Sequence, residues 1–544
     1  MSLNFGFGIH SSGVPCLRSA FDVATDLVHE SAANVGKFKL DTVAGTKLSY
    51  VYDIYQQGYD SRYNNGGTTR FYSFANGDLN TVVSTSQSAF GTSAATIQWS
   101  NNAQGRQTLY YFPAWWPWGY LPIVEYRDRT GAATGVFDGP SVRYFTNSGL
   151  VGYVLSTVAY TCQTAMVSTG ATPAQRETYN LPLQTSTNSN ISRFNWQLSV
   201  LQLPARNDAL PDFSTAPVSG QTQLLLNATT ARLALAGRDV TSSNPDHFIF
   251  SEDKIPAKIM AAGDINVAGS GTVDIHCPLP ITEFTYMDFH VKKQVDTEFW
   301  HPPFYNGISS AGNYGFSYFV DVANQKITVT NGTSTAISIR YIIFADSEDA
   351  FTTGGKKIFY QGNDGTQDFV QIKRPGSSDL APNLNDILAD SRLAYLPILA
   401  EGFLNWSTDF PTTITGSDRF KGEKMATVAI SNPAPKLKLF CKTIVVFPSP
   451  TSPNGLISGL HRVFTDAGAW IGRASCDSCW ANIHAAEDGA DFYMSGDNPV
   501  AVQYNSGTGS YDVSYAQRWA GGSSFPITPP LGLRYYIFGI PQSL

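Results

Sequence analysis

Carboxylates are the side chains of this chain that could most directly do chemistry. Two of them facing each other across a cleft can hydrolyse a glycosidic bond. The acidic residues that could serve in this way lie in the last third of the sequence: Asp364, Asp368, Glu401, Asp409, Glu487 and Asp491. Their spacing selects no pair, because the two carboxylates of such sites come from distant strands. We therefore predict no catalytic residue and keep a polysaccharide-degrading enzyme as an alternative function.

Local motifs of nucleophilic, nucleotide and metalloprotease chemistry are missing from the sequence. It contains no Gly-x-Ser-x-Gly, no Gly-x-x-x-x-Gly-Lys-Ser/Thr and no His-Glu-x-x-His. The glycine pairs at Gly6 and Gly8 and at Gly354 and Gly355 lack the strand–loop–helix context that binds phosphate. The sequence therefore predicts neither a bound cofactor nor an enzyme.

Two short segments could bind a metal ion. Cys476 and Cys479 have the spacing of one half of a zinc site, but His461 and His484 do not complete a standard finger. Free or structural thiols are the first interpretation, with a local disulfide or a metal as alternatives. The oxygens of residues 363–368 lack the spacing of an EF-hand and predict a polar β-turn. We predict no metal site.

Two aromatic clusters are the most distinctive chemical feature, and prolines lie among their rings. The first consists of Tyr110, Tyr111, Phe112, Trp115, Trp116, Trp118 and Tyr120, and the second includes Trp300, Phe304 and Tyr305. Exposed rings could stack on sugars or contact a protein. We expect burial at an interface between subunits or domains, with ligand contact and an intradomain core as alternatives. In particular, the three tryptophans of the first cluster are predicted to lie against another domain or subunit.

The composition is that of a β-protein with few charges. Of 544 residues 15% are charged and 13% aromatic, and the formal net charge is −7. The acidic balance, without any block of Lys and Arg, argues against binding to nucleic acid. The N-terminus has no cationic region followed by an apolar core, and no apolar run is long enough to cross a membrane. We expect synthesis in a cytoplasm without a signal peptide, and no membrane insertion.

A five-residue phrase occurs twice, as Arg340-Tyr341-Ile342-Ile343-Phe344 and as Arg534-Tyr535-Tyr536-Ile537-Phe538. Each copy continues an alternating stretch, so the pattern predicts strands over 337–344 and 531–540. A recurring closing strand indicates that the chain completes one β-domain and then builds another like it. Chance is the alternative for so short a repeat.

Further strands are predicted along most of the chain, together with a few helical segments. The strands include 38–40, 108–112, 121–126, 194–203, 248–250, 271–276, 284–291, 315–322, 326–330, 426–430 and 436–447. Apolar spacing predicts helices over 16–34 and within 383–403. Residues 466–490 are expected to be a helical or irregular insertion, and Asn331-Gly332 predicts a tight turn between two strands.

These elements predict a mainly β fold, with several β-sandwich or jelly-roll-like domains in tandem and short helices. The length requires more than one core. The expected division is an N-terminal attachment domain over 1–100, an aromatic-rich β-domain over 101–240, a β-sandwich over 241–350, a connector with a helix over 351–423 and a C-terminal β-sandwich over 424–544.

The chain resembles tail structural proteins of tailed bacteriophages, of the tail-fibre, tail-tip or baseplate receptor-binding type. The resemblance is one of style, carried by the leader Met1–Ile9, the loops rich in Ser, Thr, Asn and Gly, and the two closing strands. It implies a virion protein that takes part in host attachment. The implied partners are other copies in a homo-oligomer, most often a trimer, other phage tail proteins, and a host surface glycan or protein. A jelly-roll capsid or decoration protein is a further alternative.

Overall fold

The structure is a computed structural model in which most of the second half of the chain is described. It covers residues 4–43, 218–243, 247–253, 258–281, 285–301, 316–331, 334–344, 350–415, 422–432, 436–447, 479–494 and 531–541, and elsewhere the backbone of further strands. The described residues form antiparallel strands with two short 3₁₀ helices, so the predicted mainly β class is confirmed. No described helix is long and apolar enough to cross a membrane.

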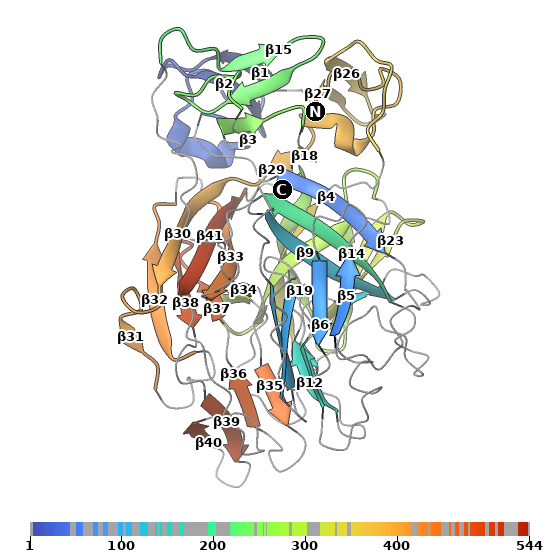
Figure 1. Cartoon of the computed structure of the whole chain (residues 1–544). Helices are drawn as coiled ribbons and strands as arrows, with labels where there is room; N and C mark the ends of the chain where they lie inside the picture. Colours follow the sequence, from blue (N-terminus) through green and yellow to red (C-terminus); the bar gives the residue numbers. More distant parts are fainter. Residues whose placement is uncertain are drawn as a thin grey trace.

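Three small sheets gather at one end of the molecule, drawn at the top of Figure 1. Each is a meander of three consecutive strands. The sheets are β1 (Phe5–Ile9), β2 (Pro15–Ala20) and β3 (Phe38–Asp41); β15 (Leu224–Leu226), β16 (Ala231–Ala234) and β17 (Phe248–Phe250); and β26 (Phe359–Asn363), β27 (Asp368–Lys373) and β28 (Ile387–Asp390). Apolar side chains from all three, among them Leu17, Leu233 and Ile372, share one core.

A β-sandwich of seven strands follows the second meander. Its strands are β19 (Lys258–Val267), β20 (Thr272–His276), β21 (Tyr286–Lys293), β22 (Phe299–His301), β23 (Phe316–Asp321), β24 (Lys326–Asn331) and β25 (Ile337–Phe344). One layer has the order β19-β25-β21-β22 and the other β20-β24-β23. Ile339, Ile343 and Val329 belong to the core between the two layers.

A second sandwich with the same order follows the third meander. Its corresponding strands are β30 (Ile398–Asn405), β32 (Lys424–Ala429), β33 (Lys438–Phe447), β34 (Leu456–Ser458), β37 (Cys479–Ile483), β38 (Gly489–Met494) and β41 (Gly532–Ile540). The layers are β30-β41-β33-β34 and β32-β38-β37, with additional short strands between some of them. The repeated phrase occupies the same central strand, β25 or β41, in both sandwiches. The predicted structural repeat is therefore confirmed.

A third copy of the four-stranded layer follows the first meander. It consists of β4 (Tyr50–Gln57), β14 (Phe194–Gln202), β9 (Tyr120–Asp128) and β10 (Val136–Asp138), in this order across the sheet. The chain thus repeats one plan, a meander followed by a sandwich layer closed by its last strand. We call residues 4–202 the first repeat, 218–344 the second repeat and 350–541 the third repeat.

Bulges at matching places support the equivalence of the three repeats. The ladder between the first and last strands of each layer contains one, and the extra residue lies on the first strand each time: at Ile259/Ala261, at Ile398/Ala400, and in β4 opposite Ser199/Leu201. Each meander also has one between its second and third strands. Because bulges re-aim a strand and are designed features of a fold, their recurrence indicates one ancestral plan.

The repeats are joined edge to edge into a closed cycle. The last strand of each four-stranded layer pairs with a strand of another repeat: β10 with β23, β22 with β37, and β34 with β8 (Gly105–Tyr110) of the first repeat. Two short linkers, β18 (Ile255–Pro256) and β29 (Ala394–Tyr395), add further cross-repeat pairing. Each large sheet therefore spans two repeats, and the sheets cross the predicted boundaries near 100 and 240.

The helix predicted over 16–34 is wrong. Residues 15–20 are strand β2, and only Ala32–Lys37 forms a 3₁₀ helix. The apolar spacing has another cause: Leu17 is buried in β2, whereas Leu27 and Val28 lie over Gly6 and Gly8 of β1, where a Cβ atom would come within about 3 Å of them. Side chains from a strand and a loop thus imitate one helical face.

The predicted helix within 383–403 is also wrong. Only Leu384–Asp386 is helical, as one 3₁₀ turn capped by Asn383, and β28, β29 and β30 follow. The residues of β28 are buried on both faces. A strand of this kind loses its alternation and cannot be distinguished from a buried helix by pattern alone. Within 466–490 the structure has β36 (Arg473–Cys476) and β37, so the helical interpretation fails there too.

Asn331 does not start a tight hairpin. Strands β24 and β25, on either side of Asn331-Gly332, belong to different layers. The Asn331 side chain is buried and donates from Nδ2 to the carbonyls of Ala268 and Thr335, at 3.0 and 2.8 Å. It therefore fixes a crossing between layers. Residues 363–368, in contrast, form the predicted polar turn between β26 and β27, with Gly365 at φ +91°.

Candidate functional site

All six acidic residues considered for glycan hydrolysis have structural partners. Asp364 accepts from the backbone of its own turn, Asp368 from Asn363, Asp409 from the Asn405 amide, and Asp491 from Thr427. Glu401 pairs with Arg534 at 2.6 Å, and Glu487 pairs with Arg340. Partners of this kind hold each carboxylate in place. Two of the six, Glu401 and Glu487, lie opposite buried arginines of the repeated closing strand.

The candidate site is the cluster around Arg340, at the joint between the second and third repeats. Arg340 lies in the middle of β25 and is 3% exposed. Its Nε and Nη2 donate to the Asp264 carboxylate of β19 at 2.9 and 3.2 Å, and its Nη1 and Nη2 donate to Glu487 at 2.9 and 2.6 Å. The guanidinium thus bridges one carboxylate of its own repeat and one of the next repeat.

Glu487 is positioned by a strained turn. It ends the turn between β37 and β38 at φ +55°, in the left-handed region that only a small share of non-glycine residues occupy. From there Oε2 accepts from the backbone amide of Leu439 at 2.8 Å, while the Leu439 carbonyl accepts from Arg340 at 2.9 Å. Asn432 and Lys436 donate to the backbone of the same turn. The turn is therefore held from several elements of the third repeat.

The electrostatics of the cluster favour the charged forms. Burial of the Arg340 guanidinium alone would lower its pKa, but hydrogen bonds and charges from Glu487 and Asp264 outweigh burial and raise it above the usual value. Lys438 adds a second cation at 3.5 Å from Asp264. Two carboxylates face two cations, so the charges balance. The Arg340 guanidinium also lies 4.4 Å from the centre of the Phe299 ring.

Further contacts extend the joint on either side of Arg340. His290 of β21 accepts from the Cys441 amide at 3.1 Å, and its ring lies 3.9 Å from that of Phe440. Asn482 donates to Glu298 next to the β22–β37 pairing. Such an arrangement can hold two repeats in one orientation. The carboxylates of Asp264 and Glu487 are bound by cations and by a backbone amide, which suits a role in joining the two repeats.

The aromatic candidates fall partly on this joint. Trp300 of β22 is 8% exposed in the single chain and packs on Tyr493 of the third repeat, with ring centres 5.5 Å apart. Tyr110 ends β8 and its backbone pairs with Ile457, at the joint between the first and third repeats. Tyr120 begins β9, while Tyr111, Phe112, Trp115, Trp116, Trp118, Phe304 and Tyr305 lie outside the described residues. The role of these seven in an interface stays a prediction.

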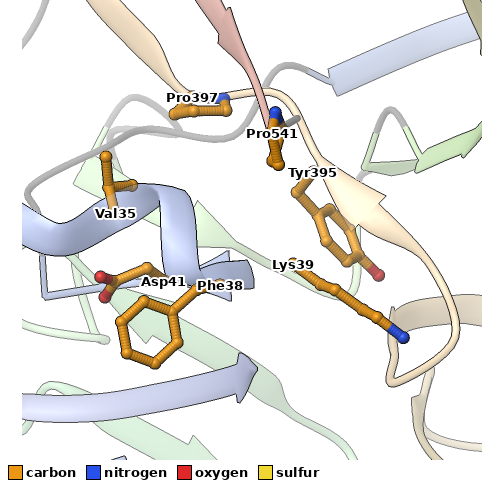
Figure 2. Close-up of a pocket in the computed structure, with 7 residues that line it drawn as sticks. All are labelled: Val35, Phe38, Lys39, Asp41, Tyr395, Pro397 and Pro541. Atoms are coloured by element: carbon orange, nitrogen blue, oxygen red, sulfur yellow. The ribbon is translucent and has the colours of Figure 1, made fainter. Parts of the chain in front are cut away.

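A small pocket lies where the first meander meets the third repeat. Figure 2 shows its lining, with Lys39, Asp41, Tyr395 and the prolines Pro397 and Pro541 around it. It has room for about one water molecule. The Lys39 ammonium donates to the Ser391 carbonyl at 3.2 Å, and burial lowers the pKa of this group. The pocket is too small for an organic ligand and forms part of a packed seam.

The thiols of the described residues are apart from one another. Cys16, Cys277 and Cys441 are free, and burial raises the pKa of the Cys277 thiol to about 11. Cys476 ends β36 and Cys479 begins β37, in two different sheets. Within the ranges that the structure describes, no three His, Cys, Asp or Glu side chains are grouped so as to hold a metal ion.

His484 lies beside the joint and pairs with two aspartates of its own hairpin. It starts the turn that Glu487 ends, and its ring lies 3.0 Å from Asp488 and 3.3 Å from Asp491, which also binds Thr427. Partial burial alone would lower the pKa of His484, but the hydrogen bonds that its ring donates to Asp491 and Asp488 outweigh burial and raise the pKa above 6.5. The charged imidazole therefore stabilises the folded state below pH 6.5, and this contribution is lost as the pH rises through the raised pKa.

We expect His484→Gln to lower the free energy of unfolding at pH 5.5 by under about 1 kcal/mol, because His484 and its aspartate partners are partly exposed to water. The measurement is the urea midpoint of the protein and of His484→Gln at pH 5.5 and pH 8.5. The variant should lose stability relative to the parent at pH 5.5 and much less at pH 8.5. An equal loss at both pH values would contradict the assignment.

Sequence reasoning did not single out Arg340 and Arg534 as interface residues. The indication was present, since one charge stands at the same place in an otherwise apolar strand in both copies of the phrase. A cation in a strand that is buried throughout needs a buried anion. Which anion it meets depends on the cycle of repeats. Asp264 and Glu487 carry no local indication of their role.

Comparison of the chain with protein-family models, curated proteins and solved structures finds no match. The internal repetition is accordingly the strongest likeness on which an argument can rest.

Proposed function

We propose that this chain is a structural protein of a bacteriophage virion, located in the tail as a fibre, tip or baseplate component, and that it takes part in host attachment. The closed cycle of three repeats supports this proposal. Cyclic assemblies occupy symmetry axes, and a tail is built around one axis. The low share of charged residues and the long loops rich in Ser, Thr, Asn and Gly are further support.

The hydrogen bonds and ion pairs that bind the six acidic residues favour a structural role over a polysaccharide-degrading tailspike enzyme. A general acid needs a raised pKa and access to substrate, whereas hydrogen bonds within the turns lower the pKa of Asp364 and of Asp409. The enzyme hypothesis has a direct test. Purified protein is incubated with host capsule and lipopolysaccharide, and new reducing ends are measured. Their release would replace the structural proposal with the enzymatic one.

Labelling of the particle tests the structural proposal itself. Gold-labelled antibody against the chain should mark the tail of intact virions, and antibody fragments should reduce adsorption to cells. Labelling that covers the shell would instead favour the capsid or decoration protein. Purified protein without affinity for virion parts or host cells would contradict both.

The number of chains in the assembled oligomer follows from a mass measurement. The homotrimer expected from the resemblance stays a proposal, and the cycle of repeats suggests a simpler unit, because one chain already supplies three like repeats. Light scattering distinguishes a particle of 59.1 kDa from its multiples. A single-chain mass would place one copy, and a threefold mass three copies, at each axial position.

A further inference from the structure

The large sheet that joins the first repeat to the second ends in an open edge. Its last strand is β20, and among the strands that the structure describes β20 pairs only with β24. The Asn331 amide donates to the Gly271 carbonyl at 2.9 Å, and from there inward and outward backbone groups alternate along the strand. The N–H and C=O groups of Thr272, Asp274 and His276 therefore point away from the sheet, and these three residues are exposed.

Strand β20 has the same place in the second repeat that β32 has in the third. Both are the outer strand of a three-stranded layer, and both pair along their whole length with the neighbouring strand, β24 or β38. A hydroxyl donates to a carboxylate across each of the two ladders. In the second repeat Thr328 donates to Asp274 at 2.7 Å, and in the third Thr427 donates to Asp491 at 2.6 Å. The two residue types are exchanged between the strands, but the cross-strand pair is retained.

The third repeat covers this edge with a short strand of its own. Strand β31 (Thr412–Thr413) pairs antiparallel with the start of β32 and comes from the connection between β30 and β32, residues 406–423. The corresponding connection of the second repeat is residues 268–271. It is a turn in which the Gly271 amide donates to the Ala268 carbonyl at 3.0 Å. A connection of this length cannot supply a covering strand, so the second repeat leaves the equivalent edge open.

The edge of β20 also lacks the features that keep most edge strands from pairing. Natural edge strands are blunted by lysine, proline, bulges or very short length. Strand β20 has five residues without lysine or proline, and its ladder with β24 contains no bulge. Its one acidic residue, Asp274, already binds Lys326 at 2.8 Å across the ladder. The outward backbone groups therefore form a regular template for one more strand.

We propose that β20 is the docking site for an extended segment of another protein, which adds to the sheet antiparallel, as β31 adds to β32. Hydrogen bonds to the backbone of Thr272, Asp274 and His276 give the affinity, and the side chains of the incoming strand give the selectivity. The outer face of β24 carries Thr328 and Thr330, so hydroxyl and β-branched side chains continue this face. A lysine opposite Asp274 adds a favourable charge pair. The proposal does not depend on the virion role.

A second copy of this chain is a poorer occupant of the edge. A strand that pairs with its own copy about a twofold axis does so antiparallel, and the register with the most pairs places Asp274 opposite Asp274. Like charges directly opposite each other are destabilising. The occupant is therefore a strand of different sequence.

Hydrogen exchange of the full chain tests whether the edge is open and whether a strand adds to it. The probe is the synthetic peptide Thr-Val-Thr-Lys-Thr-Val-Thr at millimolar concentration, and exchange is followed by mass spectrometry. The amides of Thr272, Asp274 and His276 should exchange rapidly in the free protein, and the peptide should slow them by about tenfold or more. Slow exchange before the peptide is added would mean that the edge is already covered. That result, or a peptide that leaves the three amides unchanged, would overturn the proposal.

The matched variants Asp274→Pro and Asp274→Ala test the role of the outward amide. Proline removes that amide and leaves the hydrogen bonds to β24, whereas alanine removes only the carboxylate. Binding of the fluorescently labelled peptide should be about tenfold weaker in the proline variant than in the alanine variant. Equal binding by both would count against the proposal.

Two further readings complete the experiment. If Asp274→Pro does not fold, His276→Pro and His276→Ala are compared in the same way, because the His276 amide also points outward. Light scattering of the parent and the proline variant tests the second copy as occupant. A dimer of the parent that the proline variant loses would identify this chain as its own partner and would contradict the proposal.

Discussion

Replacing Phe344 by Ala is expected to lower the free energy of unfolding by about 3–5 kcal/mol, among the largest effects of any single side chain here. Phe344 ends β25 and is fully buried, although it points away from the core of its own sandwich. The closing strand is buried on both faces because the second face packs within the cycle of repeats. Loss of the ring leaves a cavity there that rigid sheets cannot close.

The measurement is urea unfolding of the full chain, followed by circular dichroism and by tryptophan fluorescence. Ile343→Ala, which removes a side chain from the sandwich face of the same strand, should also be costly, at about 2–5 kcal/mol. Phe359→Ala is the control, since that ring is 46% exposed and its loss should cost about 1 kcal/mol or less. A mild effect of Phe344→Ala beside a large effect of Ile343→Ala would mean that the outer face is not packed.

A second large effect is expected in the first meander. Asp41→Asn should cost about 3 kcal/mol, because it leaves the buried guanidinium of Arg18 without its counter-charge. The two side chains are 1% and 0% exposed, and two hydrogen bonds of 2.9 and 3.1 Å join them. Arg18 cannot release its proton at accessible pH, so the cation stays charged in the folded state.

The comparison with a double variant separates burial of charge from simple loss of contacts. Arg18→Met with Asp41→Asn removes both charges and should be less destabilising than Asp41→Asn alone, as seen by the same urea experiment. Asp26→Asn is the control, because both Asp26 and its partner His29 are largely exposed, and it should leave the urea midpoint nearly unchanged. A double variant that is worse than the single one would show that packing of the Arg18 stem dominates.

Strand placement could be predicted well from the sequence, for a physical reason. Short runs of apolar and β-branched residues bounded by turn residues located β17, β20 and β25 to within a residue. The failures are also physical. Strand β28 is buried on both faces, so its sequence has no period, and Leu27 and Val28 lie over glycines of another strand. Local pattern carries no information about such second faces.

The cluster around Arg340 was harder to predict from the sequence than the strands were. Arg340 and Glu487 are 147 residues apart in the chain, and pairings between distant strands, such as β22 with β37, bring their repeats together. The repeated phrase predicted that two domains would be alike. It could not predict that a third layer, closed by β14, belongs to the same series.

The edge-to-edge pairing has a consequence for how such a chain can change over generations. Because every large sheet takes strands from two repeats, deleting one whole repeat would expose a free edge on each remaining neighbour and leave a gap that two units cannot span. Ordinary solenoids grow or shrink by single units, since each unit contacts only its neighbours in sequence. A closed cycle lacks that freedom. The three repeats must therefore be retained together for the fold to persist.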